Sequence, residues 1–428
     1  MISIPVIHTL IRPNTTCSAS FYLILFGLML SLAIPNSLLV TWGVPYDIPG
    51  GAAWAKFHPS TYAIVLGFLI HRLSGRSGPV PHPWLTRAQQ AMTGYLLSAV
   101  ACGLYALLRF GPNGSGFFVD TLIVPGLLGS ALLAASTDQQ RQVFRFLLAV
   151  LFFNALLGIG EALIQSRLMP YLVGDMPVEE DFFRATALGG HPLYNAQNTA
   201  EISLAALIYA GRRQLLLIPV FLLALLAFGS RAALVVLIGL WLVWAMRSFF
   251  TRLFSRQLDA RFLLFILFSL ILVVGIVGVA IWEGTLGTRI FAEFYWDESA
   301  RARSVAFNAL GLMNLETFLF GGGPEFGEFA LEYLKTSSDM AGIENFWIML
   351  ILHLGVIPLL FLASALLKMI YRLVEEESLP LKLTALAFLI LASSTNSLAS
   401  KTSSLTLLMA ILIGARAEAA SQESLHRP

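Results

Sequence analysis

The 428-residue sequence predicts an all-α, polytopic integral membrane protein with about 12 transmembrane helices and one large folded outer loop. Apolar residues make up 57% of the chain and charged residues only 12%, whereas a soluble globular protein carries about 25% charged residues. Apolar runs recur along the chain, and Lys and Arg are shared unequally between alternate connections. This composition argues against a water-soluble enzyme, and a net charge of +2 is too small to indicate a nucleic-acid partner.

The apolar runs give the predicted helices in chain order. A spanning helix needs about 20 mostly apolar residues. Twelve segments approach this length, at 20–42, 54–72, 88–109, 117–136, 142–164, 191–211, 214–229, 231–249, 262–282, 343–370, 380–395 and 401–415. The second, the seventh and the last two are the weakest, because they are short or interrupted. No internal repeat is visible, so we expect a single membrane domain over residues 1–428.

The basic residues indicate which connections face the cytoplasm. If the N-terminus is cytoplasmic, 17 of the 27 Lys and Arg residues fall in inner segments and 10 in outer segments. Cytoplasmic loops carry an excess of Lys and Arg, so we expect both termini in the cytoplasm and an even number of helices. Seven of the outer basic residues lie between 167 and 335, where this rule disfavours them.

Two outer connections are long enough to carry function. The smaller covers residues 165–190 and the larger covers residues 283–342. Loops beyond about 12–15 residues are usually functional or disordered. The larger one is rich in Phe, Tyr and Trp, and disordered segments lack such aromatic residues. We therefore expect it to fold as a lid over the outer face.

The larger loop has the pattern of two short helices. Asp297 could cap a helix that starts at Glu298, and four apolar residues then fall near one face of it: Val305, Ala309, Leu312 and Leu319. The turn Gly321-Gly322-Gly323-Pro324 would end this helix, and a second one could cover 325–335.

Some polar residues lie inside the predicted spans. We expect Asn195 to make hydrogen bonds between helices inside the bundle. Asp120 and Glu161 lie nearer the outer ends of their helices, and we expect interfacial placement without a catalytic role for both.

Three short motifs follow one another along the chain. The first is Gly190-His191-Pro192 and the second is Gly229-Ser230-Arg231. The third runs from Arg301-Ala302-Arg303 through the glycine-rich turn at 321–324 to Glu344-Asn345. In this order and spacing, they resemble the O-antigen polymerase/O-antigen ligase superfamily, which includes exopolysaccharide polymerases. That family has a Gly-His-Pro segment and a Ser-Arg motif that each open a helix, then a large outer loop. The resemblance covers about residues 150–370.

The resemblance implies a metal-independent membrane glycosyltransferase of the bacterial inner membrane, with both long loops in the periplasm. The donor would be an oligosaccharide on undecaprenyl diphosphate. The acceptor would be a sugar hydroxyl on a second lipid-linked glycan in a polymerase, or on the lipid A core in a ligase. No cofactor is expected. The bilayer, a chain-length regulator and a flippase are the further expected partners, and nucleic acid is not.

A diphosphate leaving group calls for arginines, whose planar forks grip phosphate oxygens in pairs. The sequence has no Asp-x-Asp motif and no His cluster with metal-ligand spacing, so we expect no metal site. Arg231 matches the Ser-Arg motif at an outer helix start, where the helix dipole also suits phosphate; the alternative is a snorkelling interfacial anchor. Arg301 and Arg303 match the loop arginines, although either could instead pair with Asp297 or Glu298.

Three further residues are candidate substrate ligands. Arg184 precedes the Gly-His-Pro segment and could face the same cavity, or it could be a solvated loop charge. His191 could bind the acceptor or shape the helix start before Pro192. Arg289 lies in the larger outer loop with the other candidate arginines.

Glu344-Asn345 departs from the ligase pattern, in which a catalytic His precedes the span after the lid. This departure favours a polymerase over a ligase. Glu344 could accept the acceptor's proton as a general base, with Asn345 binding substrate beside it, or it could be a helix-start acid favoured by the dipole. The alternative from another class is a lipid-linked glycan transporter or flippase. A flippase should carry pseudo-repeats and charges in both halves, whereas charges and motifs here gather in one half and on one face.

Overall fold

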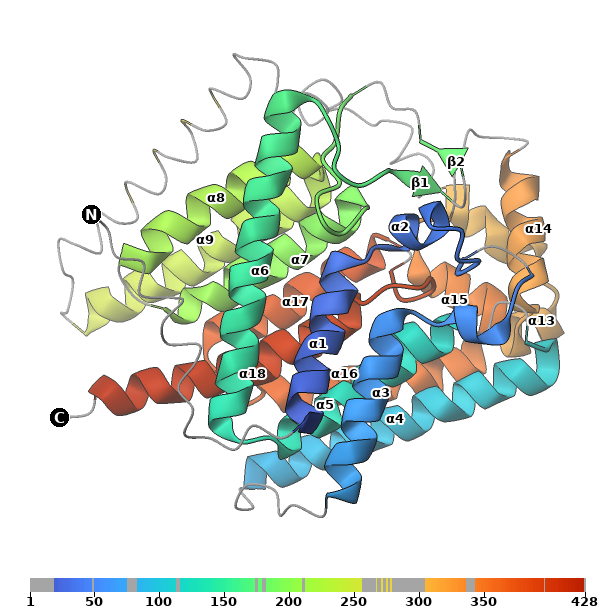
Figure 1. The fold of residues 1–428 in the computed structure, drawn as a ribbon, viewed down its shortest axis with the longest axis horizontal. Helices are drawn as coiled ribbons and strands as arrows, with labels where there is room; N and C mark the ends of the chain where they lie inside the picture. Colours follow the sequence, from blue (N-terminus) through green and yellow to red (C-terminus); the bar gives the residue numbers. More distant parts are fainter. Residues whose placement is uncertain are drawn as a thin grey trace.

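The computed structural model describes residues 19–47, 50–74, 83–112, 116–173, 176–178, 182–209, 212–255, 305–335, 343–395 and 397–426, together with positions 267, 271, 275 and 278. This part of the chain is almost entirely helical (Figure 1), which confirms the predicted all-α class. Its strands form one short antiparallel hairpin, β1 (Leu172–Val173) and β2 (Met176–Pro177), within the smaller outer loop. The predicted site residues Arg289, Arg301 and Arg303 lie outside the described residues.

The helices follow one another along the chain with short connections. They are α1 (Ala19–Ala33), α2 (Asn36–Thr41), η1 (Ala53–Lys56), α3 (Pro59–Leu73), α4 (Pro83–Phe110), η2 (Phe118–Ile123), α5 (Val124–Ala134), α6 (Thr137–Ile164), α7 (Pro192–Ala205), η3 (Ala206–Ile208), α8 (Arg212–Phe228), α9 (Arg231–Phe254), η4 (Phe307–Leu312), α13 (Leu315–Phe320), α14 (Gly323–Lys335), α15 (Phe346–Leu354), α16 (Val356–Val374), α17 (Leu379–Ser393) and α18 (Ser404–His426).

Five helices in the described part are long and apolar enough to cross a membrane: α4, α6, α9, α16 and the Ser404–Gln422 part of α18. Shorter apolar helices complete the bundle, among them α1, η2 with α5, and α17. Many large apolar side chains on these helices are exposed, for example Leu97, Leu108, Val235 and Leu360. Exposed apolar surface on this scale suits a helix bundle that faces lipid.

Several predicted spans differ from the helices that form. The run 20–42 ends as a helix at Ala33, because Pro35 cannot donate the next helical hydrogen bond, and α2 follows it. The run 343–370 divides into α15 and α16 at Gly355, which has a φ of +82°. The last helix begins at Ser404 and continues to His426, well beyond residue 415. The segment 262–282 lies almost entirely outside the described residues.

The described part of the larger outer loop, residues 305–335, is folded. Its first predicted helix is wrong as one continuous element, because η4 ends at Leu312 and Asn314 begins α13 by accepting a hydrogen bond from Thr317 N at 2.8 Å. The second predicted helix is confirmed as α14. A small apolar core joins this loop to α15 and is formed by Ala306, Ala309, Ala330, Leu334, Ile343, Ile348 and Leu352.

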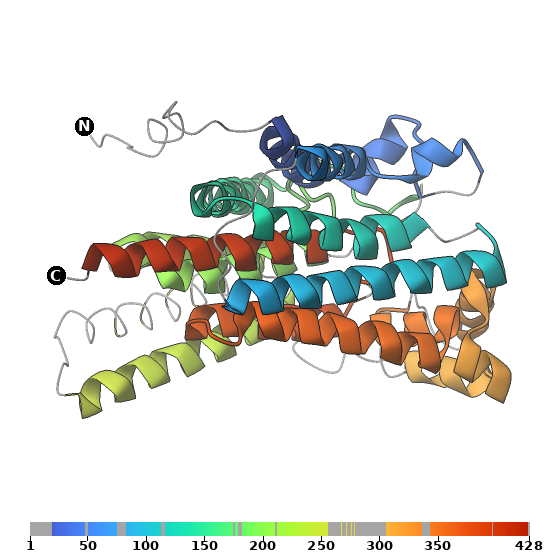
Figure 2. The same cartoon turned by 90° about the horizontal axis from the view of Figure 1, so that it is seen from below.

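This folded loop is fixed to one end of the bundle. Gly322 N donates to Leu352 O at 2.8 Å, and Arg109 at the end of α4 pairs with Glu316 at 3.0 Å. Figure 2 shows α13 and α14 beside the C-terminal end of α4, whereas the C-terminal ends of α9 and α18 lie at the opposite end of the molecule. The loop therefore stands at the end where β1, β2 and α2 also lie (Figure 1).

Candidate functional site

Two adjoining cavities open at the end of the bundle that carries the long loops. The smaller, here called the arginine pocket, holds about 100 Å³ and is lined by Arg184 and Arg231. The larger, here called the hydroxyl cavity, holds about 340 Å³. They share six lining residues, namely Tyr171, His191, Leu193, Gln197, Glu344 and Thr395. The shared wall indicates one site with two compartments.

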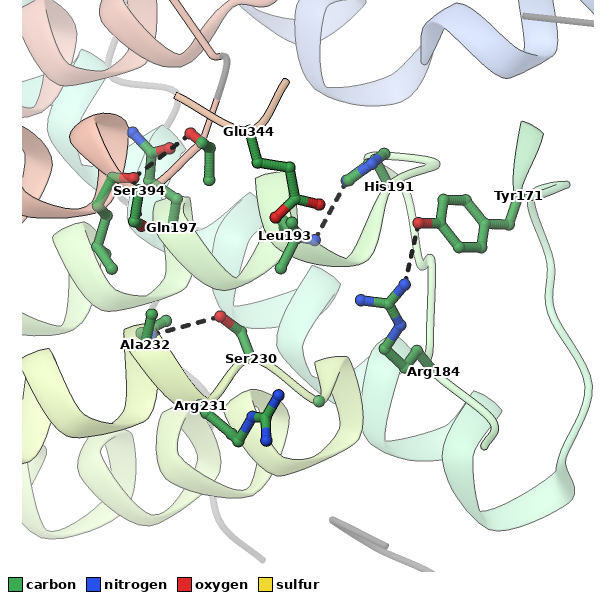
Figure 3. Close-up of a pocket in the computed structure, with 14 residues that line it drawn as sticks. Tyr171, Arg184, His191, Leu193, Gln197, Ser230, Arg231, Ala232, Glu344 and Ser394 are labelled. Carbon is green, nitrogen blue, oxygen red and sulfur yellow. Dashed lines mark hydrogen bonds between the residues drawn. The ribbon is translucent and has the colours of Figure 1, made fainter. Parts of the chain in front are cut away.

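The arginine pocket brings together four residues predicted from separate motifs. Arg184 comes from the loop before α7, His191 from the start of α7, Arg231 from the start of α9 and Glu344 from the segment before α15. Figure 3 shows their side chains around one space. Two guanidinium groups and one carboxylate thus line a single pocket.

Arg231 is placed by a tight break between α8 and α9. Gly229 adopts a φ of +65°, a conformation that favours glycine, and its N–H bonds back to Leu225 O and Leu226 O at 3.1 Å each. Ser230 then caps α9, because its hydroxyl accepts from Ala233 N at 3.3 Å. As the first residue of α9, Arg231 lies at the positive end of the helix dipole.

Arg184 is not the solvated loop charge that one reading of the sequence allowed. Only 6% of its surface is exposed. Its Nη2 donates to Tyr171 Oη at 3.0 Å, and its guanidinium lies 5.4 Å from the centre of the same ring. The next residue, Ala185, donates from its N–H to Ala227 O at 3.0 Å. This bond ties the Arg184 segment to the end of α8, just before Arg231.

Two polar residues of α6 hold the loop that carries Arg184 and His191. The Glu161 carboxylate accepts backbone hydrogen bonds from Leu168 at 2.7 Å and from Thr186 and Ala187 at 2.8 Å each. Three such bonds satisfy a buried carboxylate that would otherwise be costly. Glu161 therefore has a structural role, as organiser of the smaller outer loop.

Asn154 makes the second attachment. Its Oδ1 accepts from Leu188 N at 2.8 Å, and its Nδ2 donates to Asn195 Oδ1 at 3.1 Å. Asn195 in turn donates to Thr186 O. The predicted interhelical hydrogen bonding of Asn195 is confirmed, because Asn154 lies on α6 and Asn195 on α7.

His191 shapes the start of α7 and also lines both cavities. Its Nδ1 accepts from Leu193 N at 3.2 Å, so the imidazole is the helix N-cap immediately before Pro192. The ring packs edge-on against Tyr171, with the ring centres 5.3 Å apart. The sequence left a binding role and a helix-start role open, and the geometry gives His191 the second without removing it from the cavity wall.

Glu344 and Asn345 separate in their positions. Asn345 caps α15, because its Oδ1 accepts from Trp347 N at 3.0 Å and Ile348 N at 3.2 Å, and it lines neither of the two cavities. Glu344 stands before the cap and lines both. Phe346 N donates to Thr395 O at 2.8 Å, which fixes this segment against the end of α17.

The hydroxyl cavity contains a charged network that sequence reasoning did not identify. The Asp120 carboxylate accepts from Tyr46 Oη at 2.7 Å, His58 N at 3.0 Å and Thr61 Oγ1 at 2.6 Å. Asp120 thus fastens the start of η2 to the segment between α2 and α3. Burial, followed by the charge of Asp120, raises the pKa of Tyr46 well above its ordinary value, so this phenol stays a neutral donor.

Lys401 adds the opposite charge from the connection between α17 and α18. Its ammonium donates to Tyr46 O, lies 4.3 Å from the centre of the Tyr46 ring and stands 3.9 Å from Asp47 Oδ1. Burial lowers the pKa of Lys401 and raises the pKa of Asp47, while each attracts the charged form of the other. The signal for this wall was the run of Ser, Thr and Asn at 393–404, which is unusual between apolar helices.

Within the residues that the structure describes, no group of three or more His, Cys, Asp and Glu side chains gathers in a way that could hold a metal ion. Comparison with known proteins gives no relative, since no protein-family model, curated protein or solved structure matches the chain.

Proposed function

We propose that the protein is a polysaccharide polymerase that joins undecaprenyl-diphosphate-linked repeat units at the periplasmic face of the bacterial inner membrane. The observation that supports this most is the convergence of Arg184, Arg231 and Glu344 on one pocket. The motif resemblance supplies the substrate class, and the pocket supplies groups that suit each end of the reaction.

The two arginines suit the donor's diphosphate. Guanidinium groups bind phosphate oxygens in pairs, and the α9 N-terminus adds positive potential where Arg231 begins. Arg184 is oriented by Tyr171 and tied to the end of α8. Such prior orientation stabilises the departing diphosphate without rearrangement during the reaction. In this proposal Arg289, Arg301 and Arg303 would approach the same anion from the larger outer loop.

Glu344 suits the acceptor end. The acceptor hydroxyl oxygen attacks the anomeric carbon of the donor glycan and forms the new glycosidic bond. The bond between that carbon and the phosphate oxygen breaks, and its electron pair leaves on the diphosphate. The hydroxyl proton passes to the Glu344 carboxylate as a general base. Charge is therefore balanced by the arginines on one side and by Glu344 on the other.

The alternative within the same chemistry is a ligase, which would transfer the finished glycan to another acceptor such as the lipid A core. The two differ in product, because a polymerase lengthens a lipid-linked glycan and a ligase moves it. A strain that lacks the protein therefore separates them: loss of polymerase leaves single repeat units, and loss of ligase leaves long chains on undecaprenyl diphosphate.

Substitution of Arg231 tests the proposal. Arg231→Ala should lower polymer formation about 10²–10³-fold, the usual cost of removing one charge-stabilising donor. Arg231→Lys should restore little, because an ammonium lacks the paired geometry of a guanidinium. Polymer length and membrane abundance are measured together in a strain that lacks the native gene.

The matched control is Arg247→Ala, which removes an exposed arginine from the same helix, away from the pocket. It should leave polymer length unchanged. Normal polymer from Arg231→Ala at normal abundance would reduce Arg231 to an interfacial anchor and would remove the main support for the proposal.

A further inference from the structure

The hydroxyl cavity contains buried polar groups whose hydrogen bonds are unmade. Ser37 at the start of α2 and Ser397 after α17 both line it, and each is only 7% exposed. In the part of the chain that the structure describes, neither Oγ has a hydrogen-bond partner. Buried hydroxyls without partners are costly, so two of them on one cavity wall indicate a ligand that donates and accepts hydrogen bonds.

The charged groups on the same wall are already satisfied. The Asp120 carboxylate receives three hydrogen bonds, and Lys401 is held by Tyr46 O and faces Asp47. The His58 ring nitrogens lie 2.6 Å from Ser60 Oγ and 2.8 Å from Ile34 O. The groups left to contact a ligand are therefore neutral hydroxyls and amides. A neutral wall favours a neutral ligand, because an anion placed there would lose its water without gaining a counter-charge.

The cavity also has the size and the position of a substrate compartment. Its volume of about 340 Å³ lies within the range of about 300–1,000 Å³ that small-molecule sites occupy. It joins the arginine pocket along a wall that includes Glu344, His191 and Gln197. A group bound in the hydroxyl cavity would therefore have the Glu344 carboxylate between itself and an anion held by the arginines.

We infer that the hydroxyl cavity is a binding subsite for an uncharged sugar, with Ser37 and Ser397 hydrogen-bonding its hydroxyls. Its assignment to the acceptor rather than the donor rests on the proposed function. The donor's diphosphate occupies the arginine pocket, so its anomeric carbon lies at the junction between the two compartments. The attacking hydroxyl approaches that carbon from the side opposite the departing phosphate, and that side is the hydroxyl cavity.

Binding measured without turnover tests the inference. The full chain is purified in lipid nanodiscs, and saturation-transfer NMR is recorded with methyl glycosides of glucose, galactose, mannose, rhamnose and N-acetylglucosamine. Methyl glucuronide and methyl galacturonide are the charged counterparts, and inorganic pyrophosphate is the probe of the arginine pocket. At least one neutral glycoside should bind, and the two uronides should not.

Three variants locate the signal. Ser37→Ala and Ser397→Ala should each weaken binding of that glycoside about three- to tenfold, the usual effect of one lost neutral hydrogen bond. Ser37→Leu should abolish it by filling the cavity. The matched control is Ser364→Ala, which removes an exposed hydroxyl of α16 far from the site and should change nothing. Pyrophosphate binding should survive in all four variants, which shows that each is folded, and it should fall in Arg231→Ala.

The outcomes separate the inference from the proposed function. If no neutral glycoside binds while pyrophosphate does, or if the neutral signal survives Ser37→Leu, the inference is overturned and the polymerase proposal stands. Preferential binding of the uronides would also overturn it. If a neutral glycoside binds as expected but pyrophosphate does not bind the wild-type protein, the sugar subsite is supported and the proposed function loses its anion site.

Discussion

At the scale of single residues, Glu344 has the clearest chemical position, because it lines the compartment with two arginines and the compartment with neutral hydroxyls. If it accepts the acceptor's proton, Glu344→Gln removes the base and keeps the size of the side chain. A positioned base contributes about 10²–10⁴-fold to a rate, so polymer should fall to a trace while the lipid-linked repeat unit accumulates. Glu344→Asp should retain part of the activity. The measurement is the polymer length distribution with membrane abundance in parallel.

Glu328→Gln is the matched control for this substitution, because Glu328 is an exposed carboxylate on α14. It should polymerise normally. Near-normal polymer from Glu344→Gln would instead leave Glu344 as an acid placed before a helix start, where loss of its charge costs at most about 1 kcal/mol. The acceptor hydroxyl would then attack without a protein base.

The residues with a chemical signature were within reach of the sequence, and the residues that hold them were not. Arg184, His191, Arg231 and Glu344 stand in motifs, and the structure brings all four to one pocket. Glu161 was expected to be interfacial without a catalytic role, and its three hydrogen bonds make it the support of the Arg184 loop. Its partners are backbone N–H groups, which every residue type except proline supplies, so no sequence pattern marks them.

At the scale of elements, the breaks between helices place the site more than the helices do. Gly355 divides α15 from α16 with a φ of +82° and a ψ of 168°, a conformation that is essentially restricted to glycine. Its neighbour in space is the Gly321 turn of the larger outer loop. The apolar run 343–370 read as one span, because neither the φ of a single glycine nor its contact with a distant turn is visible in hydrophobic periodicity.

Gly355→Ala should release this contact. A Cβ at Gly355 would stand 2.4 Å from Gly321 N, Leu319 O and Phe320 N, all of them backbone atoms. Strained backbone alone costs about 1–3 kcal/mol, and the clash adds to it. We expect a lower midpoint of thermal unfolding in detergent and faster proteolysis within residues 305–335. Thermal unfolding followed by tryptophan fluorescence and limited proteolysis measure the two effects.

The same substitution elsewhere has the opposite expected sign. Gly239 lies in the middle of α9, and a Cβ there would meet no atom within 4 Å. Gly239→Ala should stabilise the helix by about 0.5–1 kcal/mol, because alanine loses less backbone entropy than glycine. Equal thermal midpoints for the two variants would contradict the assigned role of the Gly355–Gly321 contact.

At the scale of the whole molecule, the two ends of the bundle differ in character. One end carries both cavities, the β1–β2 hairpin and the folded part of the larger outer loop (Figure 1). The other end carries ion pairs that link the starts of α4 and α6 to the α16–α17 turn and to α18: Arg87 with Glu375 and Glu376, Arg145 with Glu418, and Arg416 with Glu377. These arginines belong to the segments that the charge bias assigns to the cytoplasm.

Composition was sufficient for the fold class, since low charge and long apolar runs leave little besides a helical membrane protein. It was insufficient for helix ends, which depend on Pro35, Gly355 and the capping residues Asn314 and Asn345. The hydroxyl cavity was out of reach for a different reason. Its walls come from α1 to α3, α7 and the segment at 395–406, and only the packed bundle brings these parts together.

Cysteine labelling tests the arrangement of the ends in the membrane. In a background with Cys17→Ser and Cys102→Ala, single cysteines are placed at exposed positions of the cavity end by Met176→Cys and Tyr333→Cys, and of the opposite end by Ser74→Cys and Ser255→Cys. Because 17 of the 27 basic residues fall in the predicted inner segments, we expect the cavity end to face the periplasm. A maleimide that cannot cross the inner membrane should label the first pair in spheroplasts and the second pair only after permeabilisation. The reverse pattern would place the arginine pocket in the cytoplasm, away from the proposed donor's leaflet. Labelling of Met176→Cys and Tyr333→Cys from opposite sides would contradict a single end that holds both long loops.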